Sequence, residues 1–545
     1  MVDGIVSEPG DEANEFVFIT PDDTEIKNGE FIYYTGSVEV ENDDGELEEQ
    51  EKKIFARVTQ REQKRGYPDR FMSDPGVSPE AVAGKLGIAT EGVDLYRLTA
   101  NVIGYYNEKL DDFTNPRIVP KPGTEVELAS DNDLEEYLTE ADPEEIGSAY
   151  IGDLLHRPPG GTDIHLPIDN FASTHLSILA STGSGKSYTA SVLVEEMMQP
   201  DSRAAMLIID PHGEYHSLQE MEEDERFQDE DEGYSPEIDL KNPEDIHIRI
   251  SELNLSDLYS VLDDPSDAQE HVLSEAWSSL KADDDVDFNY VTLNQIKERC
   301  QEVAENDSTA NALEWRLDKA LDRDLFDSSN HLALSQLLEP GKCTVLQLDT
   351  MNLREQQMLV SVLFQKINRA RVRYEKDGEG DIDFPVFGLL EEGHRFAPAD
   401  GEAQSLGPLS TILSEGRKFG IGIGIISQRP SKIDDDVLSQ CKTQIIMQIQ
   451  NPLDQDAVKK GVEDVGEDLL SELPGLTPGQ AIIAGDSVNT PFPARIRERY
   501  TTHKAESLPA TDEWQKTWRK NNDIEVDGRA DPDQEEGAED REQRL

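Results

Sequence analysis

The stretch Leu176–Ala190 reads LSILASTGSGKSYTA and decides the fold of the chain. An apolar run at residues 176–180 predicts a short buried strand, a glycine-containing loop follows at residues 181–185, and Lys186 opens a helical stretch. Strand, glycine-rich loop and helix in this order are the setting of a phosphate-binding P-loop. The first glycine of the pattern G-x-x-x-x-G-K-[ST] is Ala180 here, which is tolerated where φ is negative. The alternative is a glycine-rich turn with an exposed lysine.

The residue types of this loop suit the chemistry of phosphates. Glycines let backbone N–H groups converge on phosphate oxygens, and the N-terminus of the following helix adds the positive end of its dipole. Lys186 would reach the β- and γ-phosphates of a nucleotide, and the Ser187 hydroxyl would ligate Mg²⁺. We therefore predict a nucleotide site formed by the following residues: Thr182, Gly183, Ser184, Gly185, Lys186, Ser187 and Tyr188.

A second buried strand, PVFGLL at residues 385–390, ends at the adjacent carboxylates Glu391 and Glu392. A P-loop needs a carboxylate on a neighbouring strand. By position Glu391 would hold Mg²⁺ and Glu392 would polarise the attacking water. Glu391 stands where Asp is usual, so its extra methylene must be accommodated. An exposed acidic pair is the alternative in so acidic a chain, but the preceding apolar run favours the functional interpretation.

The last predicted strand, Ile421–Ile426, has candidate residues on both sides. Gln428 follows the strand and could sense hydrolysis beside the γ-phosphate, or it could be an ordinary polar residue at a strand end. Arg417 precedes the strand. A cation near a γ-phosphate can stabilise the charge of the transition state, and in a ring one subunit could insert Arg417 into the next subunit's site. Spacing alone favours a surface arginine.

The motif DPHGEY at residues 210–215 follows another apolar strand, Ala205–Ile209. Open α/β sheets place ligands at the carboxyl ends of their strands, where Asp210 would lie. His212 and Glu214 could contact water or a neighbouring subunit. The motif could equally be a tight turn.

Changes in composition and in hydropathy pattern divide the chain into five parts. Short apolar runs with Gly, Asp, Asn and Pro between them predict a small β-barrel at residues 1–128, or a β domain that is not a barrel. Residues 129–148 have the acidity of a linker. Strands and helices alternate over residues 149–505, which predicts an α/β core with a parallel sheet. A helical insertion is predicted at 251–338, and an acidic tail without fixed structure at 506–545.

Composition excludes several classes of protein. The 545 residues carry 50 Lys+Arg against 115 Asp+Glu, a net charge of −65, which excludes a basic nucleic-acid coat but leaves room for a local basic site. Such a surface suits multimolar salt, where charge repulsion is screened within about 3 Å, so we infer a halophilic source. Three cysteines without metal-ligand spacing exclude a disulfide scaffold. No targeting segment and no apolar run of about 20 residues is evident, so we expect a cytoplasmic protein without a membrane span.

Together these segments resemble the HerA family of hexameric DNA-translocating ATPases, in the HerA/FtsK branch of P-loop motors. The resemblance covers most of the chain. It rests on STGSGKS (181–187), DPHGEY (210–215) and LLEEGHRFAP (389–398), and above all on EGRKFGIGIGIISQRPSKIDDDVLSQCKTQII (415–446). The N-terminal PKPGTEV looks like part of the family's β-barrel. The resemblance implies a RecA-like core, a hexameric ring around duplex DNA, and work with a NurA-type nuclease in resecting broken DNA ends.

The resemblance also implies a role for each candidate residue. Lys186 and Ser187 would bind ATP and Mg²⁺, with Glu391 at the metal and Glu392 as the catalytic carboxylate. Gln428 would be the sensor, and Arg417 a finger that acts in the neighbouring subunit. The motif residues Asp210, His212 and Glu214 would contact and orient the residues that bind ATP and Mg²⁺.

Two other functions stay open at this point. One is a DNA-transfer ATPase of the conjugation type, although those relatives usually carry or recruit a membrane anchor. The other is an ATP-gated platform that binds proteins and does not translocate. The segment after Pro398, ADGEAQSLGP, favours the platform because it has no Lys or Arg and contains Asp400 and Glu402.

Overall fold

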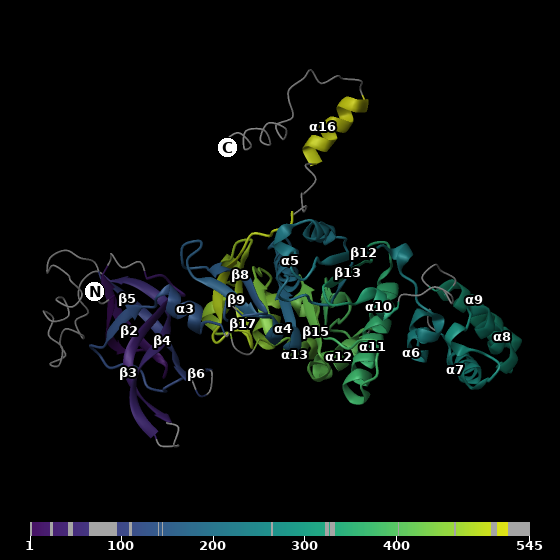
Figure 1. Cartoon of the computed structure of the whole chain (residues 1–545), viewed down its shortest axis with the longest axis horizontal. Coiled ribbons are helices and arrows are strands. Elements are labelled where there is room, and N and C mark those ends of the chain that lie inside the picture. Colours follow the sequence, from purple (N-terminus) through teal and green to yellow (C-terminus); the bar gives the residue numbers. More distant parts are fainter. Residues whose placement is uncertain are drawn as a thin grey trace. The chain divides into compact units, whose positions relative to one another are not determined.

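A computed structural model gives the fold of the chain (Figure 1). The structure describes residues 3–21, 26–41, 47–64, 95–107, 109, 112–139, 141–143, 145–262, 265–321, 326, 333–401, 403–462, 465–502 and 510–521. Residues up to Thr501 form one compact unit and the remainder a second. Within the described helices, none combines the length and the apolarity that crossing a bilayer requires.

The N-terminal strands close into a barrel. Their hydrogen-bonded order is β2-β1-β7-β3-β4-β5, and β5 pairs again with β2, so six strands close on themselves and β6 extends the sheet beside β5. Apolar side chains such as Phe18, Tyr34 and Leu98 fill the interior. The predicted barrel is confirmed. Its strands are β1 (Gly4–Pro9), β2 (Glu15–Pro21), β3 (Phe31–Glu41), β4 (Leu47–Lys64), β5 (Leu95–Asn107), β6 (Asp112–Thr114) and β7 (Glu125–Leu128).

The acidic segment after the barrel differs from the linker that we predicted. It forms a short helix, α3 (Asp131–Tyr137), which starts with a capping box between Ser130 and Asp133. Leu134 and Leu138 are buried in the same apolar cluster as strands of the core. Two leucines one helical turn apart give this acidic segment a packed face, so it joins the barrel to the core by direct contact.

A large mixed sheet forms the core. Seven neighbouring strands, β12-β13-β11-β14-β15-β10-β16, are parallel, and the antiparallel series β17-β18-β8-β9 extends this sheet from β16. The strands are β8 (Ser148–Leu154), β9 (Asp163–Pro167), β10 (Leu176–Leu179), β11 (Met206–Asp210), β12 (Glu237–Lys241), β13 (Lys342–Gln347), β14 (Val386–Leu390), β15 (Ile421–Ser427), β16 (Thr443–Met447), β17 (Gln480–Gly485) and β18 (Phe492–Ile496). The seven parallel strands and their crossover helices confirm the predicted α/β, RecA-like core. The prediction of a wholly parallel sheet was wrong, because β17, β18, β8 and β9 pair antiparallel.

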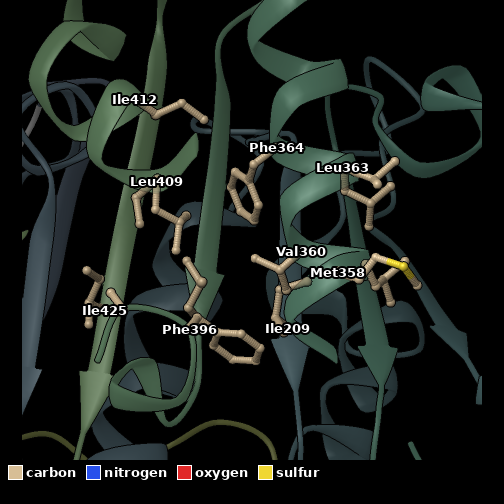
Figure 2. Close-up of a cluster of buried hydrophobic side chains, with 14 of the residues drawn as sticks. Ile209, Met358, Val360, Leu363, Phe364, Phe396, Leu409, Ile412 and Ile425 are labelled. Atoms are coloured by element: carbon tan, nitrogen blue, oxygen red, sulfur yellow. The ribbon is translucent and has the colours of Figure 1, made fainter. Parts of the chain in front are cut away.

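Helices cover the sheet through apolar faces. Figure 2 shows Met358, Val360 and Phe364 of α11 gathered with Ile209 of β11 and Ile425 of β15, and these side chains belong to one buried cluster. Each such side chain contributes about 1.5–3 kcal/mol by leaving water. The helices around the sheet are α4 (Ile168–Thr174), α5 (Lys186–Met197), α11 (Leu353–Asp377), α12 (Leu406–Glu415), α13 (Asp435–Gln440), α14 (Pro452–Gly461) and α15 (Glu467–Glu472).

The predicted helical insertion is present between β12 and β13. Leu313, Leu317 and Leu321 of α9 are buried, as their common helical face predicts, and Trp277 of α7 is 2% exposed. The insertion contacts α11 through an ion pair of 2.8 Å between Lys366 and Glu252. Its helices are α6 (Leu255–Val261), α7 (Asp267–Ala282), α8 (Leu293–Val303), α9 (Asp307–Leu321) and α10 (Leu334–Leu337).

The C-terminal unit contains a helix that we did not predict, α16 (Ala510–Asn521). Trp514 and Trp518 lie one turn apart on it and are 71% and 60% exposed. The acidic run that begins at Asp523 lies outside the described residues.

Candidate nucleotide site

Backbone conformation shapes the loop between β10 and α5. Gly183 and Gly185 have φ values of 81° and 101°, which favour glycine because they lie in the left-handed region. A Cβ on Gly185 would come within 3.3 Å of Cε of Met447. The loop is fastened to the sheet because Ser181 N–H donates to the carbonyl of Gln448 at 2.8 Å. Ala180 is not among the residues of positive φ, so an alanine fits in place of the usual first glycine.

The Lys186 ammonium lies among carboxylates. Its Nζ makes an ion pair with Oε1 of Glu391 and lies 3.3 Å from Oε1 of Glu392, and both glutamates are buried. Burial disfavours the charged ammonium, but the charges of Glu391 and Glu392 outweigh it and raise the pKa of Lys186. The residues that we expected to handle phosphates and water are therefore brought together, although they are separated by about two hundred positions in the sequence.

One expectation about the sheet was wrong. We expected the carboxylates on a strand beside the P-loop strand, but β10 pairs with β15 and β16, and β14 lies beyond β15. Two strand spacings amount to about 9.6 Å. The side chains of Lys186, at the start of α5, and Glu391, after β14, nevertheless meet in an ion pair.

Glu392 has an unusual backbone conformation. Its φ is 53°, in the left-handed region that few non-glycine residues adopt. Its buried Oε2 has no hydrogen-bond donor within the described part of the chain and lies 3.3 Å from Nδ1 of His394. Strain of this kind persists where the surrounding structure holds a side chain in a required place. The unpaired oxygen suits a carboxylate that polarises a water molecule.

The motif DPHGEY folds into a turn around the carboxylate of Asp210. The backbone N–H groups of His212, Gly213 and Tyr215 donate to this carboxylate at 3.1, 2.8 and 3.3 Å. The turn brings Glu214 to the hydroxyl of Ser187, which donates to Oε2 of Glu214. The side chain of His212 is exposed, and its backbone N–H supports the turn.

Tyr215 is a site residue that our sequence analysis missed. Its side chain is fully buried, and its hydroxyl donates to Oε2 of Glu391 at 2.7 Å. Burial raises the pKa of this hydroxyl well above its usual value, so it stays a donor. A large aromatic residue at the end of a polar turn was the available signal.

Gln428 lies beside the P-loop. Its Oε1 accepts a hydrogen bond of 2.5 Å from the hydroxyl of Thr182. Tyr188 faces another part of the core, since its hydroxyl accepts from the backbone N–H of Arg499 at 2.7 Å. Gln428 is therefore near the loop that would hold the γ-phosphate, and Tyr188 braces the first turn of α5.

The structure does not bring Arg417 to the nucleotide site of its own chain. Arg417 is exposed in the turn Gly416–Phe419, which precedes β15. Because β15 runs parallel to β10, this turn lies at the edge of the sheet opposite the P-loop. The seven residues of β15 put about 20 Å between the two edges.

The donors fit a magnesium ion bound together with a nucleotide. Nowhere in the described ranges do three His, Cys, Asp or Glu side chains form a metal-binding group. Mg²⁺ at nucleotide sites keeps several waters and takes one or two protein oxygens. The hydroxyl of Ser187, 3.3 Å from Oε1 of Glu391, offers such a pair of hard oxygen donors.

Comparison with known proteins agrees with this geometry. Residues 149–367 match the family described as "Helicase HerA, central domain". The DNA double-strand break repair helicase HerA of Pyrococcus furiosus is 29% identical over 397 residues, which are 64% of this chain and 69% of that relative. HerA of Sulfurisphaera tokodaii is 29% identical over 430 residues, 75% of this chain and 80% of that relative.

Two solved structures align with large parts of this chain. VirB4 of Thermoanaerobacter pseudethanolicus aligns with a TM-score of 0.47 at 15% identity, over 66% of this chain and 99% of that one. The conjugative coupling protein TrwB aligns with a TM-score of 0.45 at 13% identity, over 69% and 94%.

A strand, a glycine-shaped loop and a helix that carries Lys186 and Ser187 opposite buried carboxylates define a P-loop NTPase. Several HerA helicases are 28–29% identical to this chain over 64–75% of its length, and the model of the HerA central domain matches from β8 into α11. The chain is therefore similar to the HerA helicases, and its residues 149–367 match the central domain of that family.

Proposed function

We propose that this chain is an ATP-dependent translocase or helicase on duplex DNA. It would act as a hexameric ring in the resection of DNA double-strand breaks with a NurA-type nuclease, in the cytoplasm of a halophile. The observation that carries the proposal is the convergence of Lys186, Glu391, Glu392 and Gln428 at the P-loop. The names of the relatives, DNA double-strand break repair helicases, support DNA as the partner.

The site supports a direct role for each side chain in ATP hydrolysis. Lys186 would exchange its contacts with the two glutamates for the β- and γ-phosphates. Glu392, with one unpaired oxygen, would accept a hydrogen bond from the attacking water and take its proton. Gln428 would report on the γ-phosphate through Thr182. Mg²⁺, held by Ser187 and Glu391, would neutralise charge on the phosphates.

A ring would explain the position of Arg417. This side chain is exposed and lies at the opposite end of the strands from its own P-loop, about 20 Å away, so we infer that it serves the site of another subunit. An arginine supplied in this way stabilises the charge of the transition state. Hydrolysis would then couple each subunit to the next.

DNA contact in this chain would depend little on ion pairing. The segment after Pro398 lacks Lys and Arg, and its start is tied to Lys432, whose carbonyl accepts from Ala399 N–H at 2.9 Å. At molar salt the release of counterions contributes little to DNA affinity. Hydrogen bonds from backbone N–H groups and the fit of the protein surface to the duplex would hold the DNA instead.

ATP turnover in about 2 M KCl, a concentration that screens the acidic surface, tests the proposal. Turnover would be compared without DNA, with linear duplex and with closed-circular duplex, and Glu392→Gln would serve as the control that binds ATP but hydrolyses it poorly. We expect linear duplex to stimulate the wild type more than circular duplex does, because a closed ring loads at ends.

Hydrolysis that no DNA stimulates would refute the translocase. That result would favour the ATP-gated protein platform, for which the acidic segment at Asp400 is the supporting observation. Stimulation by single-stranded DNA in preference to duplex would favour the DNA-transfer ATPase.

A further inference from the structure

Glu391 is held from two sides. One carboxylate oxygen, Oε1, makes the ion pair with Lys186 and lies 3.3 Å from the hydroxyl of Ser187. The other, Oε2, accepts the hydrogen bond of 2.7 Å from Tyr215. The side chain is completely buried, so water does not supply further donors. The orientation of this carboxylate therefore depends on the tyrosine.

Tyr215 is fixed more firmly than a surface residue could be. Its ring is buried in the apolar cluster beneath the sheet. Its backbone N–H donates to Oδ2 of Asp210. The turn that follows β11 therefore fixes the backbone from which the Tyr215 side chain extends. The backbone N–H of Glu391 donates to the carbonyl of Ile209 at 3.1 Å, which ties both residues to the same strand.

We propose that the hydroxyl of Tyr215 is a positioning group for Glu391, which holds Oε2 so that Oε1 alone faces Lys186 and an incoming Mg²⁺. The inference rests on the proposed function of this site as a place for Mg²⁺ and ATP. A hydroxyl suits the task because it donates to one oxygen and carries no charge that would compete with the metal. Groups of this kind behind a metal ligand fix its orientation.

A purely structural tyrosine is the competing interpretation, since buried tyrosine hydroxyls usually find an acceptor. The two interpretations differ in one measurable respect. A structural tyrosine affects the stability of the fold, whereas a positioning tyrosine changes how much Mg²⁺ is needed for nucleotide binding.

Equilibrium binding of a fluorescent, non-hydrolysable ATP analogue, titrated with Mg²⁺, separates them. Tyr215→Phe keeps the ring and removes the donor. We expect it to raise the Mg²⁺ concentration at half-maximal binding about 10-fold, while nucleotide binding without Mg²⁺ stays unchanged. Tyr234→Phe is the matched control, because its half-buried hydroxyl donates to the carbonyl of Met198 at the far end of α5.

A double-variant cycle tests whether Tyr215 acts through Glu391. In the background Glu391→Ala, adding Tyr215→Phe should leave the Mg²⁺ dependence where Glu391→Ala alone puts it. A Mg²⁺ dependence of Tyr215→Phe equal to that of the wild type would overturn the inference, and so would equal effects of the two tyrosine variants. Absence of nucleotide binding by the wild type would instead refute the proposed function, and this inference with it.

Discussion

Replacing Lys186 by methionine should destabilise the nucleotide-free protein, and by an amount that depends on pH. The substitution leaves the carboxylates of Glu391 and Glu392, whose side chains are 0% and 4% exposed, without their cation. Two buried like charges so close together cannot both stay ionised, so one glutamate must take a proton.

The cost of that proton sets the magnitude. In the unfolded chain a glutamate has the ordinary pKa of 4.5. Relative to that state, placing a proton on it at pH 7 costs about 3.4 kcal/mol, at about 1.36 kcal/mol per pH unit. At pH 5 the same step costs about 0.7 kcal/mol. The folded variant binds one proton more than its unfolded state over this range, so its stability relative to the wild type increases as the pH falls.

Urea unfolding at pH 5, 6 and 7, followed by circular dichroism in about 2 M KCl, measures this difference, since salt screens exposed pairs but hardly affects a buried one. Lys366→Met is the control. Its partner Glu252 is 2.8 Å away and partly exposed, so we expect a loss below about 1 kcal/mol that does not vary with pH. A loss for Lys186→Met that is the same at pH 5 and pH 7 would refute the reasoning.

Three further predictions concern the sheet and the ring. Burial lowers the pKa of His175 to about 4, and its Nδ1 accepts from Ile423 N–H at 3.1 Å. The wild type should therefore lose up to about 1.4 kcal/mol per pH unit between pH 6.5 and 4, and His175→Gln should reduce this slope in unfolding experiments; an unchanged slope contradicts the assignment. Gly422→Ala should lower the thermal unfolding midpoint sharply, because a Cβ there would lie 1.9 Å from the carbonyl oxygen of Ala172, whereas Gly407→Ala in α12, with open space around it, should not. Arg417→Ala and Glu392→Gln subunits, each inactive alone, should regain ATP turnover when mixed, and a mixture that stays inactive would exclude an arginine that acts between subunits.

The sequence was sufficient for the elements whose signal is local. The P-loop combines an apolar strand, two glycines and a helix within 15 residues, and β10, β14 and β15 are short buried runs that end in polar residues. The order of these strands was not available locally. That β15 lies between β10 and β14 follows from pairing between segments far apart in the chain, which no single window contains.

The acidic composition of some segments hid their packed structure from the sequence analysis. In the acidic stretch after Tyr215, Met221 and Phe227 are buried and anchor two short 3₁₀ helices, His216–Glu222 and Glu225–Phe227. Nine of the 13 residues at 220–232 are acidic, a composition typical of a solvated run. Two apolar side chains among many carboxylates are enough to fasten a segment, since each contributes more by burial than a surface charge does.

The pairing of β8 with β18 has a consequence for how such proteins diversify. β8 opens the core and β18 is its last strand, and Ala494 lies opposite Leu154 in this antiparallel pair. The chain therefore enters and leaves the α/β core at neighbouring points on one margin. A module with adjoining ends can exchange what precedes and follows it without rearrangement of its interior. Recombination could thus supply new flanking domains to the same α/β core, and the nucleotide site within that core would stay intact.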